Sequence, residues 1–284
     1  MEVTGSLAEA RELCAKARGE GLAVGFVPTM GALHQGHGRL IKAAREECEF
    51  VVLSIFVNPL QFGPSEDLAA YPQPFDRDRA VAQSLGVDLL FAPSREEMFP
   101  DGEPTVTVDP GPLGDRLEGM SRLGHFRGVL TVVAKLFNVI GPSRAYFGEK
   151  DAQQLALVRR MVSDLDFPVS VAGVPTVREI DGLALSSRNA YLGPAERRTA
   201  PVLFDALSAA AALVRQGERN AHVINAEMAK RIGDEPLAHL DYVAVVDDST
   251  WEALDTIDGP ARALVAARIG PARLIDNLLL PVGA

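Results

Sequence analysis

Cysteine is scarce in this sequence: Cys14 and Cys48 are the only two among 284 residues. Two are too few for a disulfide framework or for a zinc site built from cysteines, so we expect two buried, reduced thiols. Basic residues are also outnumbered, 28 against 38 acidic ones, which gives a formal net charge of −10. This balance disfavours nucleic acid or an anionic membrane as the main partner, but it leaves room for a local basic pocket.

Long hydrophobic runs are missing as well. The longest apolar stretches, residues 51–57 and 207–214, are far shorter than the roughly 20 residues that a membrane-spanning helix needs. The first residues, MEVTGSLAEARELC, lack the basic segment and apolar run of a signal peptide. The sequence therefore predicts a soluble, cytoplasmic protein with no membrane and no nucleic-acid partner, long enough to bury a full core.

Short apolar runs alternate with helical patterns through the first two-thirds of the chain. We expect helices at residues 6–18, 36–47, 76–85, 129–140 and 151–164. Strands are expected at residues 22–27, 50–57, 87–91, 105–108, 144–147 and 169–174. Apolar strands separated by helices indicate an α/β fold with a doubly wound, Rossmann-like parallel sheet. Its ligand is expected outside the carboxyl ends of the strands.

The alternation of short apolar runs with helical patterns ends after about Arg188. Helices are expected at residues 195–216 and 221–232, followed by strands at 241–246, 262–269 and 273–279. Helices followed by strands suggest a small α+β domain. We therefore expect a Rossmann-like domain over residues 1–185 and a smaller C-terminal domain over residues 186–284 that covers the site.

Residues 28–37 read PTMGALHQGH and lie between a predicted strand and a predicted helix. Gly31 and Gly36 let backbone N–H groups approach a ligand closely, and a helix start offers unpaired donors and a positive dipole end. His34 and His37 add donors that can meet charge developing on a phosphoryl group. The segment predicts a phosphate site; the alternative is a helix cap with two incidental surface histidines.

The HQGH string resembles the HxGH signature of the nucleotidyltransferase superfamily, and the longer string is similar to that of the pantoate–β-alanine ligases (pantothenate synthetases). Further strings extend the resemblance, in order, over about residues 20–195. They are FVNPLQFG from Phe56, GHFRGVLTVVAK from Gly124, FGEKDAQQ from Phe147, VPTVRE from Val174 and DGLALSSRN from Asp181. Beyond residue 195 only length and element order agree.

The resemblance implies an ATP site drawn from three segments. Its predicted members are Met30, Gly31, His34, Gly36, His37, Gly148, Lys150, Asp151, Val177, Leu185, Ser186, Ser187 and Arg188. The predicted catalytic residues, which surround the phosphates, are His34, His37, Lys150, Ser186, Ser187 and Arg188. A compact ammonium, two hydroxyls and a guanidinium suit phosphate oxygens. Asp151 is expected to contact the ribose, and Val177 to contact adenine through its backbone.

Gln61 and Gln154, with Asn58 and Met30, are the residues that the resemblance assigns to pantoate and β-alanine. Neutral amides suit a hydroxy acid because they donate to a carboxylate and accept from a hydroxyl. The alternative for Asn58 is a simple turn before proline. Residues 62–74, FGPSEDLAAYPQP, are expected to form a mobile flap that keeps water from a reactive acyl adenylate, or else an ordinary surface loop.

The implied reaction has two steps. A pantoate carboxylate attacks the α-phosphorus of ATP to give pantoyl adenylate and pyrophosphate, and the amine of β-alanine then yields pantothenate and AMP. Mg²⁺ is expected on the ATP phosphates, because the sequence shows no dedicated metal-ligand cluster. A homodimer is also implied. Two alternatives remain: a nucleotidyltransferase acting on a phosphorylated substrate, and a non-catalytic nucleotide- or RNA-binding module.

A few positions depart from the residues usual in the family, without removing a proposed ligand. They are Gly38 after His37, Gln73 in place of arginine, Leu123 in place of proline and Leu185 in place of methionine. We expect altered kinetics rather than altered chemistry. Two further residues stay open: His125 is either a structural cap or a ligand, and Lys135 either extends to solvent or approaches the site.

Overall fold

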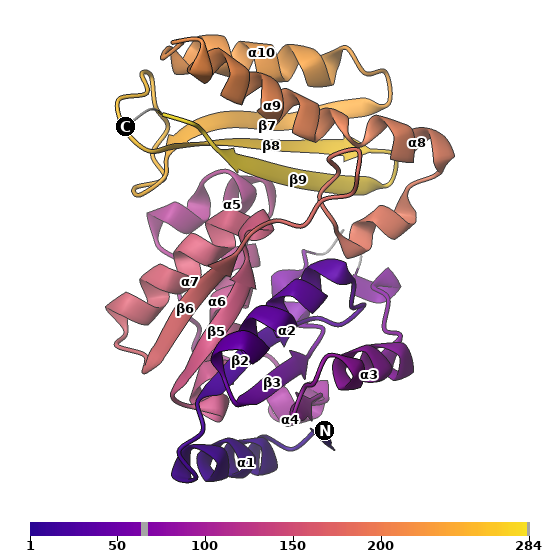
Figure 1. The fold of residues 1–284 in the computed structure, drawn as a ribbon, viewed down its shortest axis with the longest axis vertical. Helices are drawn as coiled ribbons and strands as arrows, with labels where there is room; N and C mark the ends of the chain where they lie inside the picture. The colour runs from indigo at the N-terminus through magenta and orange to yellow at the C-terminus, as the bar shows by residue number, and fades with distance from the viewer. Residues whose placement is uncertain (64–67, 283–284) are drawn as a thin grey trace. The chain divides into compact units, whose positions relative to one another are not determined.

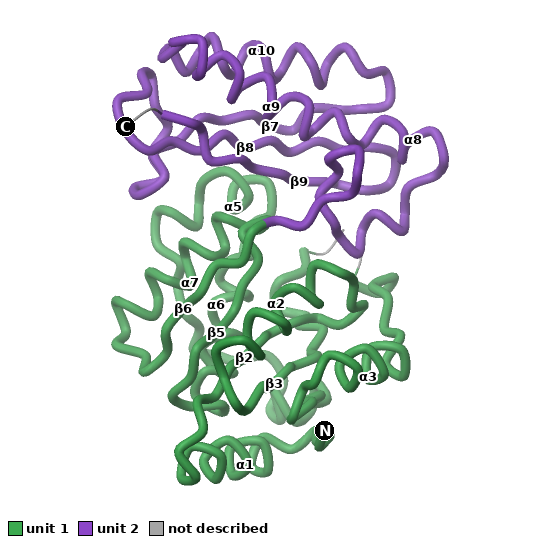
Figure 2. Tube along the Cα trace, viewed as in Figure 1, with its two compact units in different colours: residues 1–175 green, residues 176–284 purple. Residues whose placement is uncertain are grey.

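The computed structural model describes residues 1–63 and 68–282. The chain divides into two compact units, residues 1–175 and 176–284, called here the first and second unit (Figure 2). The boundary falls between residues 175 and 176 rather than between 185 and 186 as expected. The reason is that residues 177–185 form a hairpin whose Arg178 is bound to Asp276 and Asn277 of the second unit.

A six-stranded parallel sheet forms the centre of the first unit, with strand order β1-β4-β3-β2-β5-β6 (Figure 1). Its strands are β1 Glu2–Thr4, β2 Val24–Thr29, β3 Phe50–Ile55, β4 Leu89–Phe91, β5 Ser143–Gly148 and β6 Val169–Val174. The order reverses between β2 and β5, so the crevice expected for a ligand lies at the carboxyl ends of these two neighbours. The doubly wound α/β prediction is confirmed.

The strand expected at residues 105–108 is wrong. These residues join no sheet, and the N–H group of Val108 donates to the Thr131 hydroxyl at 3.0 Å instead of to a strand. Val106 is 84% exposed, so its apolar side chain packs against no core. A short run of β-branched residues therefore predicted a strand that does not form. Strand β1 was not predicted, because it is only three residues long.

Helices cover both faces of this sheet. They are α1 Leu7–Gly19, α2 Gln35–Glu47, α3 Phe75–Ser84, α4 Arg95–Met98, α5 Glu118–Ser121, α6 His125–Ile140 and α7 Ala152–Asp164. Alternate residues of β3 enter different cores: Val52 packs with α1 and α6, whereas Val51 and Leu53 pack with α2. Helix α6 is apolar almost all round and is the most buried helix of the unit. Both cysteines are buried and free, as expected.

The second unit packs helices on one face of a three-stranded antiparallel sheet (Figure 1). The strands are β7 Ala238–Asp247, β8 Ala261–Ile269 and β9 Ala272–Leu279, and the helices are α8 Pro194–Thr199, α9 Val202–Arg215 and α10 Ala221–Gly233. The single helix expected over residues 195–216 is divided in two before Val202, because Pro201 has no N–H to continue the ladder. Among the helices of residues 1–63 and 68–282, none combines the length and apolarity needed to span a bilayer.

Candidate active site

The chain makes a tight corner where β2 ends and α2 begins. Gly31 and Ala32 both have positive φ, +80° and +50°. A side chain on Gly31 would also press on the Asp78 carboxylate, 3.0 Å from an ideal Cβ, so glycine is required there. The Thr29 hydroxyl accepts from the Gly31 N–H group at 3.2 Å and donates to the Ser54 carbonyl at 2.7 Å. The corner is thereby tied to its neighbouring strand β3.

Asp78, from α3, holds the middle of this corner. Its two carboxylate oxygens accept from the N–H groups of Ala32 and Leu33 at 2.7 and 2.8 Å, and its side chain is almost fully buried. Two charge-assisted hydrogen bonds hold a left-handed, non-glycine residue in place and leave neither N–H group unpaired. No sequence pattern pointed to Asp78, because it is one of several acidic residues at the start of a helix.

His34 and His37 cap the start of α2 reciprocally. His34 Nδ1 accepts from the Gly36 N–H group at 3.1 Å, and His37 Nδ1 accepts from the His34 N–H group at 3.3 Å. A nitrogen that accepts a hydrogen bond carries no proton, so each neutral ring holds its proton on Nε2. The ring centroids are 4.1 Å apart. The pair therefore offers two adjacent Nε2–H donors.

The backbone of the corner donates mostly within the protein. The N–H groups of Gly31, Ala32, Leu33, His34 and Gly36 all have partners in the hydroxyl, carboxylate and imidazole groups just described. The phosphate donors that this geometry offers are therefore imidazole groups rather than a bare glycine-lined backbone. Gly31 and Gly36 shape the corner, and their predicted contact with ATP stays a prediction.

Burial keeps both imidazoles neutral. It lowers the pKa of His37 to about 3, with the neighbouring His34 adding to the effect and Asp151 opposing it. The pKa of His34 is also lowered, first by burial and then by the positive charge of Lys150, while Asp151 again acts in the opposite direction. Both side chains are therefore hydrogen-bond donors without charge at neutral pH.

We expect His37 to remain an uncharged Nε2–H tautomer down to about pH 5, as observed by imidazole ¹⁵N NMR. Above its ordinary pKa of 6.5, neither the folded nor the unfolded state binds the extra proton. Below that pH only the unfolded state does, so the free energy of unfolding should fall by about 1.4 kcal/mol per pH unit from this group. The His37→Asn variant should lose less stability over the same range. A ring that titrates near pH 6.5, or that carries its proton on Nδ1, would contradict the capping geometry.

A second corner follows β5, the neighbour of β2. Gly148 ends the strand, the turn Glu149–Asp151 follows, and α7 begins at Ala152. Lys150 Nζ lies 3.7 Å from Asp151 Oδ1. The charges of both residues act on the pKa of the His34 imidazole in opposite directions, so the second corner lies within electrostatic range of the first.

The amides of Asn58 and Gln61 form a small buried network after β3. Asn58 Nδ2 donates to Gln61 Oε1 at 3.0 Å and to the Gly128 carbonyl at 3.1 Å. Gln61 Nε2 lies 3.1 Å from Met30 Sδ, beside the first corner. The Gln61 side-chain oxygen thus accepts from Asn58, and the Gln61 NH₂ group is the end directed toward Met30. Asn58 also caps the short turn Pro59–Gln61, so the turn expected before proline is present, and its predicted contact with substrate stays a prediction.

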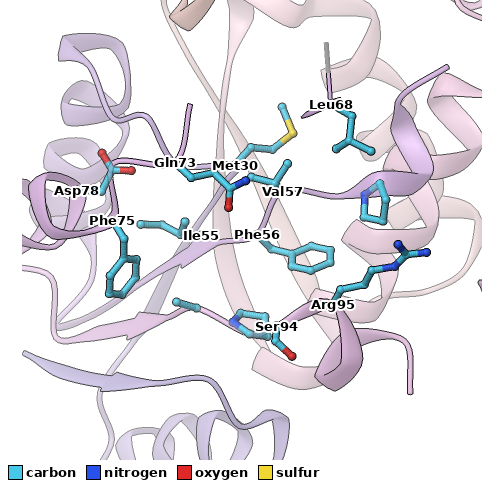
Figure 3. Close-up of a pocket in the computed structure, with 14 residues that line it drawn as sticks. Met30, Ile55, Phe56, Val57, Leu68, Gln73, Phe75, Asp78, Ser94 and Arg95 are labelled. Atoms are coloured by element: carbon cyan, nitrogen blue, oxygen red, sulfur yellow. The ribbon is translucent and has the colours of Figure 1, made fainter. Parts of the chain in front are cut away.

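Met30 also lines a cavity of about 560 Å³ (Figure 3). Its floor is apolar, from Ile55, Phe56 and neighbouring residues, and Gln73 contributes an amide to the lining. Residues 64–67 of the expected flap lie outside the described residues. On either side of them, the rings of Phe62 and Tyr71 pack edge to face, with their centroids 5.8 Å apart. The cavity shares Met30 with the Gln61 contact and runs toward α3 and α4, which line it with Phe75, Asp78 and Arg95.

The third predicted segment belongs to the second unit. Residues 177–185 form a hairpin in which the Leu185 N–H group donates to the Val177 carbonyl at 2.9 Å. Ser186 then caps the turn Ser187–Tyr191, with its hydroxyl accepting from the Arg188 N–H group at 3.3 Å. Local capping therefore brings Ser186, Ser187 and Arg188 together, next to the backbone of Val177 and Leu185.

Comparison with known proteins now decides the family. The family model described as pantoate-beta-alanine ligase matches residues 2–279. The chain belongs to the pantoate–β-alanine ligase family. The pantothenate synthetase of Heliobacterium modesticaldum is 55% identical over 263 residues, 93% of each chain. A crystal structure of pantothenate synthetase from Thermus thermophilus matches with a TM-score of 0.92 and 52% identity, covering 98% of this chain and 99% of that one.

A third relative carries ligands. The pantoate-beta-alanine ligase of Francisella tularensis, described as a complex with beta-gamma ATP and β-alanine, matches with a TM-score of 0.81 and 35% identity. The match covers 100% of this chain and 99% of that chain. The resemblance found from short motifs is thus confirmed over nearly the whole length, including the part after residue 195 that no motif covered.

The positions that depart from the usual ligase residues have different surroundings. Gln73 lines the cavity, so a change from arginine alters its charge directly. Leu123 is 86% exposed and touches no core, and Gly38 lies in the first turn of α2 with only Leu85 near its missing Cβ. Leu185 pairs with Val177 through its backbone N–H group, which any residue except proline could do. Gln73 is therefore the departure that we expect to affect kinetics.

Two structural residues of this ligase escaped sequence analysis. The buried glutamine is Gln153, not its neighbour Gln154, for which a site role was predicted. Gln153 Nε2 donates to the carbonyls of Leu113 and Arg116, and its Oε1 accepts from the Glu118 N–H group. Gln154 remains half-buried in the first turn of α7, and its predicted role is untested. Lys135, for which the sequence left two positions open, extends over the Phe99 ring, with Nζ 5.5 Å from the ring centroid. The spacing of polar residues on a helix cannot tell which of two adjacent glutamines faces inward.

Arg178 is the other missed residue, and it anchors the third segment. It makes a two-pronged ion pair with Asp276, at 2.5 and 2.9 Å, donates to the Gly182 carbonyl, and lies over the Phe204 ring at 4.2 Å. Asp276 is nearly buried. The hairpin before Ser186 is thus fixed to β9 by one guanidinium, a role that the string VPTVRE did not suggest.

Replacing Arg178 with methionine is expected to lower the free energy of unfolding by about 3–5 kcal/mol, because it leaves the Asp276 carboxylate buried without its partner. Arg197 of α8 provides a matched control, because it pairs with two more exposed carboxylates of the same hairpin, those of Glu179 and Asp181. Arg197→Met should cost no more than about 1 kcal/mol. Urea unfolding measures both, and equal losses would contradict the anchoring role.

Proposed function

We propose that this ligase joins pantoate to β-alanine at the carboxyl ends of β2 and β5, with the residues above in the following roles. The observation that carries the assignment is the reciprocally capped pair His34 and His37, which keeps an Nε2–H donor on each ring. The charges of Lys150 and Asp151 act on the pKa of His34, and the Gln61 amide contacts Met30 of the same corner. The comparisons support the reaction, and the corner geometry supports the division of roles. A donor pair, a cation and an amide side by side suit a phosphoryl centre attacked by a small carboxylic acid.

In the first step a pantoate carboxylate oxygen attacks the α-phosphorus of ATP, and the bond to the bridging oxygen of the β-phosphate breaks. Negative charge grows on the phosphoryl oxygens and on the departing pyrophosphate. His34 and His37 donate to these oxygens without carrying charge themselves, and Lys150 supplies a positive charge. Donors held by capping bonds need no reorganisation during the step, which is why preorganised groups lower the barrier.

Gln61 is proposed to bind pantoate as a donor. Asn58 already occupies its oxygen, so the NH₂ group is the end available to an oxygen of the hydroxy acid. Gln154 is proposed to provide the second amide. In the second step the unprotonated amine of β-alanine attacks the acyl carbon of pantoyl adenylate, the acyl–phosphate oxygen bond breaks, and AMP leaves. The protein supplies no covalent nucleophile in either step.

The remaining ATP contacts are proposed from the family resemblance. Asp151 would accept from the ribose, the Val177 backbone would meet adenine, and Ser186, Ser187 and Arg188 would hold phosphates. Mg²⁺ is proposed to arrive as part of the nucleotide substrate. This proposal rests on the general preference of Mg²⁺ for substrate phosphates and water over an all-protein cage.

We also propose that the enzyme works as a homodimer in the cytoplasm. The family resemblance supports the dimer. The cytoplasmic location is supported by two buried, free thiols. Sedimentation equilibrium would test the dimer directly, since a monomer at micromolar concentration would contradict it.

Product identification tests the function. Incubation with ATP, Mg²⁺, pantoate and β-alanine should yield pantothenate, AMP and pyrophosphate, as identified by mass spectrometry. Omitting pantoate serves as the control and should stop AMP release. A product that retains the nucleotide would instead indicate a nucleotidyltransferase, and ATP binding without pyrophosphate release would indicate a non-catalytic module.

A further inference from the structure

His125 lies at the start of α6 and touches the backbone of the segment that carries Gln61. It is the first residue of the helix, directly after Gly124, and only 8% of it is exposed. Its Nδ1 lies 2.9 Å from the carbonyl oxygen of Gln61. A carbonyl oxygen only accepts, so Nδ1 carries the proton and donates. Arg122 supports the same contact, with one guanidinium nitrogen 2.9 Å from His125 Nε2 and the other 3.4 Å from the Gln61 carbonyl.

We propose that His125 is a positioning residue for pantoate, which acts by fixing the main chain of Gln61 so that the Gln61 amide meets the substrate at the right place. The inference rests on the proposed function, because it names Gln61 as the pantoate donor. His125 itself is not assigned a contact with substrate. Its Nδ1 is committed to the Gln61 carbonyl, and its ring is buried against Phe126.

The first turn of α6 binds the Gln61 segment at more than one point. Besides the His125 bond, the Gly128 carbonyl accepts from Asn58 Nδ2, the same nitrogen that donates to Gln61 Oε1. Gly128 lies so close to the backbone of Leu60 and Gln61 that a Cβ would overlap it. Helix α6 is anchored in the core of the first unit along its length. The helix therefore holds both the main chain and the side chain of Gln61.

Loss of the His125 bond would leave the Gln61 carbonyl with only the longer 3.4 Å contact from Arg122, which His125 itself helps to hold in place. Asn58 would still engage the Gln61 oxygen, but the peptide that carries the side chain could rotate and shift the NH₂ group. A misplacement of about 1 Å at a binding or reacting group can cost on the order of 100-fold in rate. The His34–His37 corner has no described bond to His125, so ATP contacts should be unaffected. The expected signature is thus a selective effect on pantoate.

Three substitutions separate positioning from other roles. In His125→Asn the side-chain nitrogen takes the place of Nδ1 and can still donate to the Gln61 carbonyl. In His125→Gln the amide nitrogen takes the place of Nε2 instead, and His125→Ala has no donor. We expect the KM for pantoate in ATP–pyrophosphate exchange to rise about 10-fold or more in the Ala and Gln variants and to stay within about 3-fold of wild type in the Asn variant. The KM for ATP should not change in any of them.

Side-chain amide NMR of Gln61 gives a second readout that is independent of turnover. The Gln61 NH₂ resonances should move in His125→Ala and His125→Gln and stay near the wild-type position in His125→Asn, with unfolding midpoints measured in parallel. Equal pantoate KM values in all three variants, a rise in the KM for ATP, or a loss confined to kcat would overturn the inference. Wild-type enzyme that shows no pantoate-dependent exchange would overturn the proposed function and this inference with it. Normal wild-type exchange with three equally impaired variants would overturn the inference alone.

Discussion

Replacing His37 with alanine is expected to slow adenylate formation by about 100-fold or more. The substitution removes one preorganised Nε2–H donor from the phosphate corner, and the loss of one such donor costs on the order of 100- to 1,000-fold in rate. It also removes the acceptor for the His34 N–H group, which should lower the free energy of unfolding by about 1 kcal/mol. ATP–pyrophosphate exchange in the presence of pantoate measures the rate, and urea unfolding measures the stability.

Two conservative variants separate the contribution of the Nε2–H donor to the rate from the contribution of the Nδ1 acceptor to stability. In His37→Asn the side-chain oxygen can take over the capping role of Nδ1, but no group replaces Nε2–H. In His37→Gln the amide nitrogen can reach the position of Nε2–H. We expect the Asn variant to be stable and slow, and the Gln variant to retain more activity. His222→Ala, at an exposed histidine of the second unit that pairs with Asp255, is the control and should match wild type. Near-normal exchange in His37→Ala would refute the donor role.

Replacing Gly128 with alanine is expected to destabilise the protein, opposite to the usual effect of this substitution in a helix. In an ordinary helix interior alanine is favoured over glycine by about 1 kcal/mol. Here the new Cβ would overlap the Leu60 carbonyl and lie 2.6 Å from the Gln61 backbone nitrogen. Backbone atoms cannot move aside cheaply, so overpacking should lower the free energy of unfolding by about 1–3 kcal/mol. The displaced Asn58–Gln61 network should also raise the KM for pantoate.

Gly38 offers the matched comparison for stability. It lies in α2, and a Cβ there would meet only the Leu85 side chain at 3.6 Å, an ordinary contact. Gly38→Ala should therefore raise the free energy of unfolding by up to about 1 kcal/mol. Urea unfolding of both variants gives the test. A neutral or stabilising Gly128→Ala would show that α6 does not press on the pantoate segment as described.

The sheet of the first unit was predictable because its strands are buried on both faces and therefore apolar throughout. Periodicity located β2, β3, β5 and β6 within a few residues, and their alternation with helices gave the parallel topology. The same rule misjudged residues 105–108, where β-branched residues face solvent. It also missed the break at Pro201, since the apolar pattern continues on both sides of it. Hydrophobicity records burial, whereas hydrogen-bond partners decide where an element ends.

The site was predictable only as far as local sequence determines it. The string from Pro28 to His37 located the first corner, and the string from Phe147 located the second. Asp78, more than 40 residues away in the chain, decides which donors the first corner offers. Its carboxylate accepts from the N–H groups of Ala32 and Leu33, which the motif alone suggested were available to a ligand. The orientation of the Gln61 amide likewise depends on Asn58 and α6. Long-range partners set the polarity of each group, and a motif does not name them.

The central claim is that one site activates pantoate on ATP before β-alanine takes part. Exchange of labelled pyrophosphate into ATP, with pantoate and Mg²⁺ present and β-alanine omitted, tests it most directly. We expect exchange that depends on pantoate and that continues without any β-alanine. Exchange that appears only when β-alanine is added would show that no separable adenylate forms, and it would contradict the account.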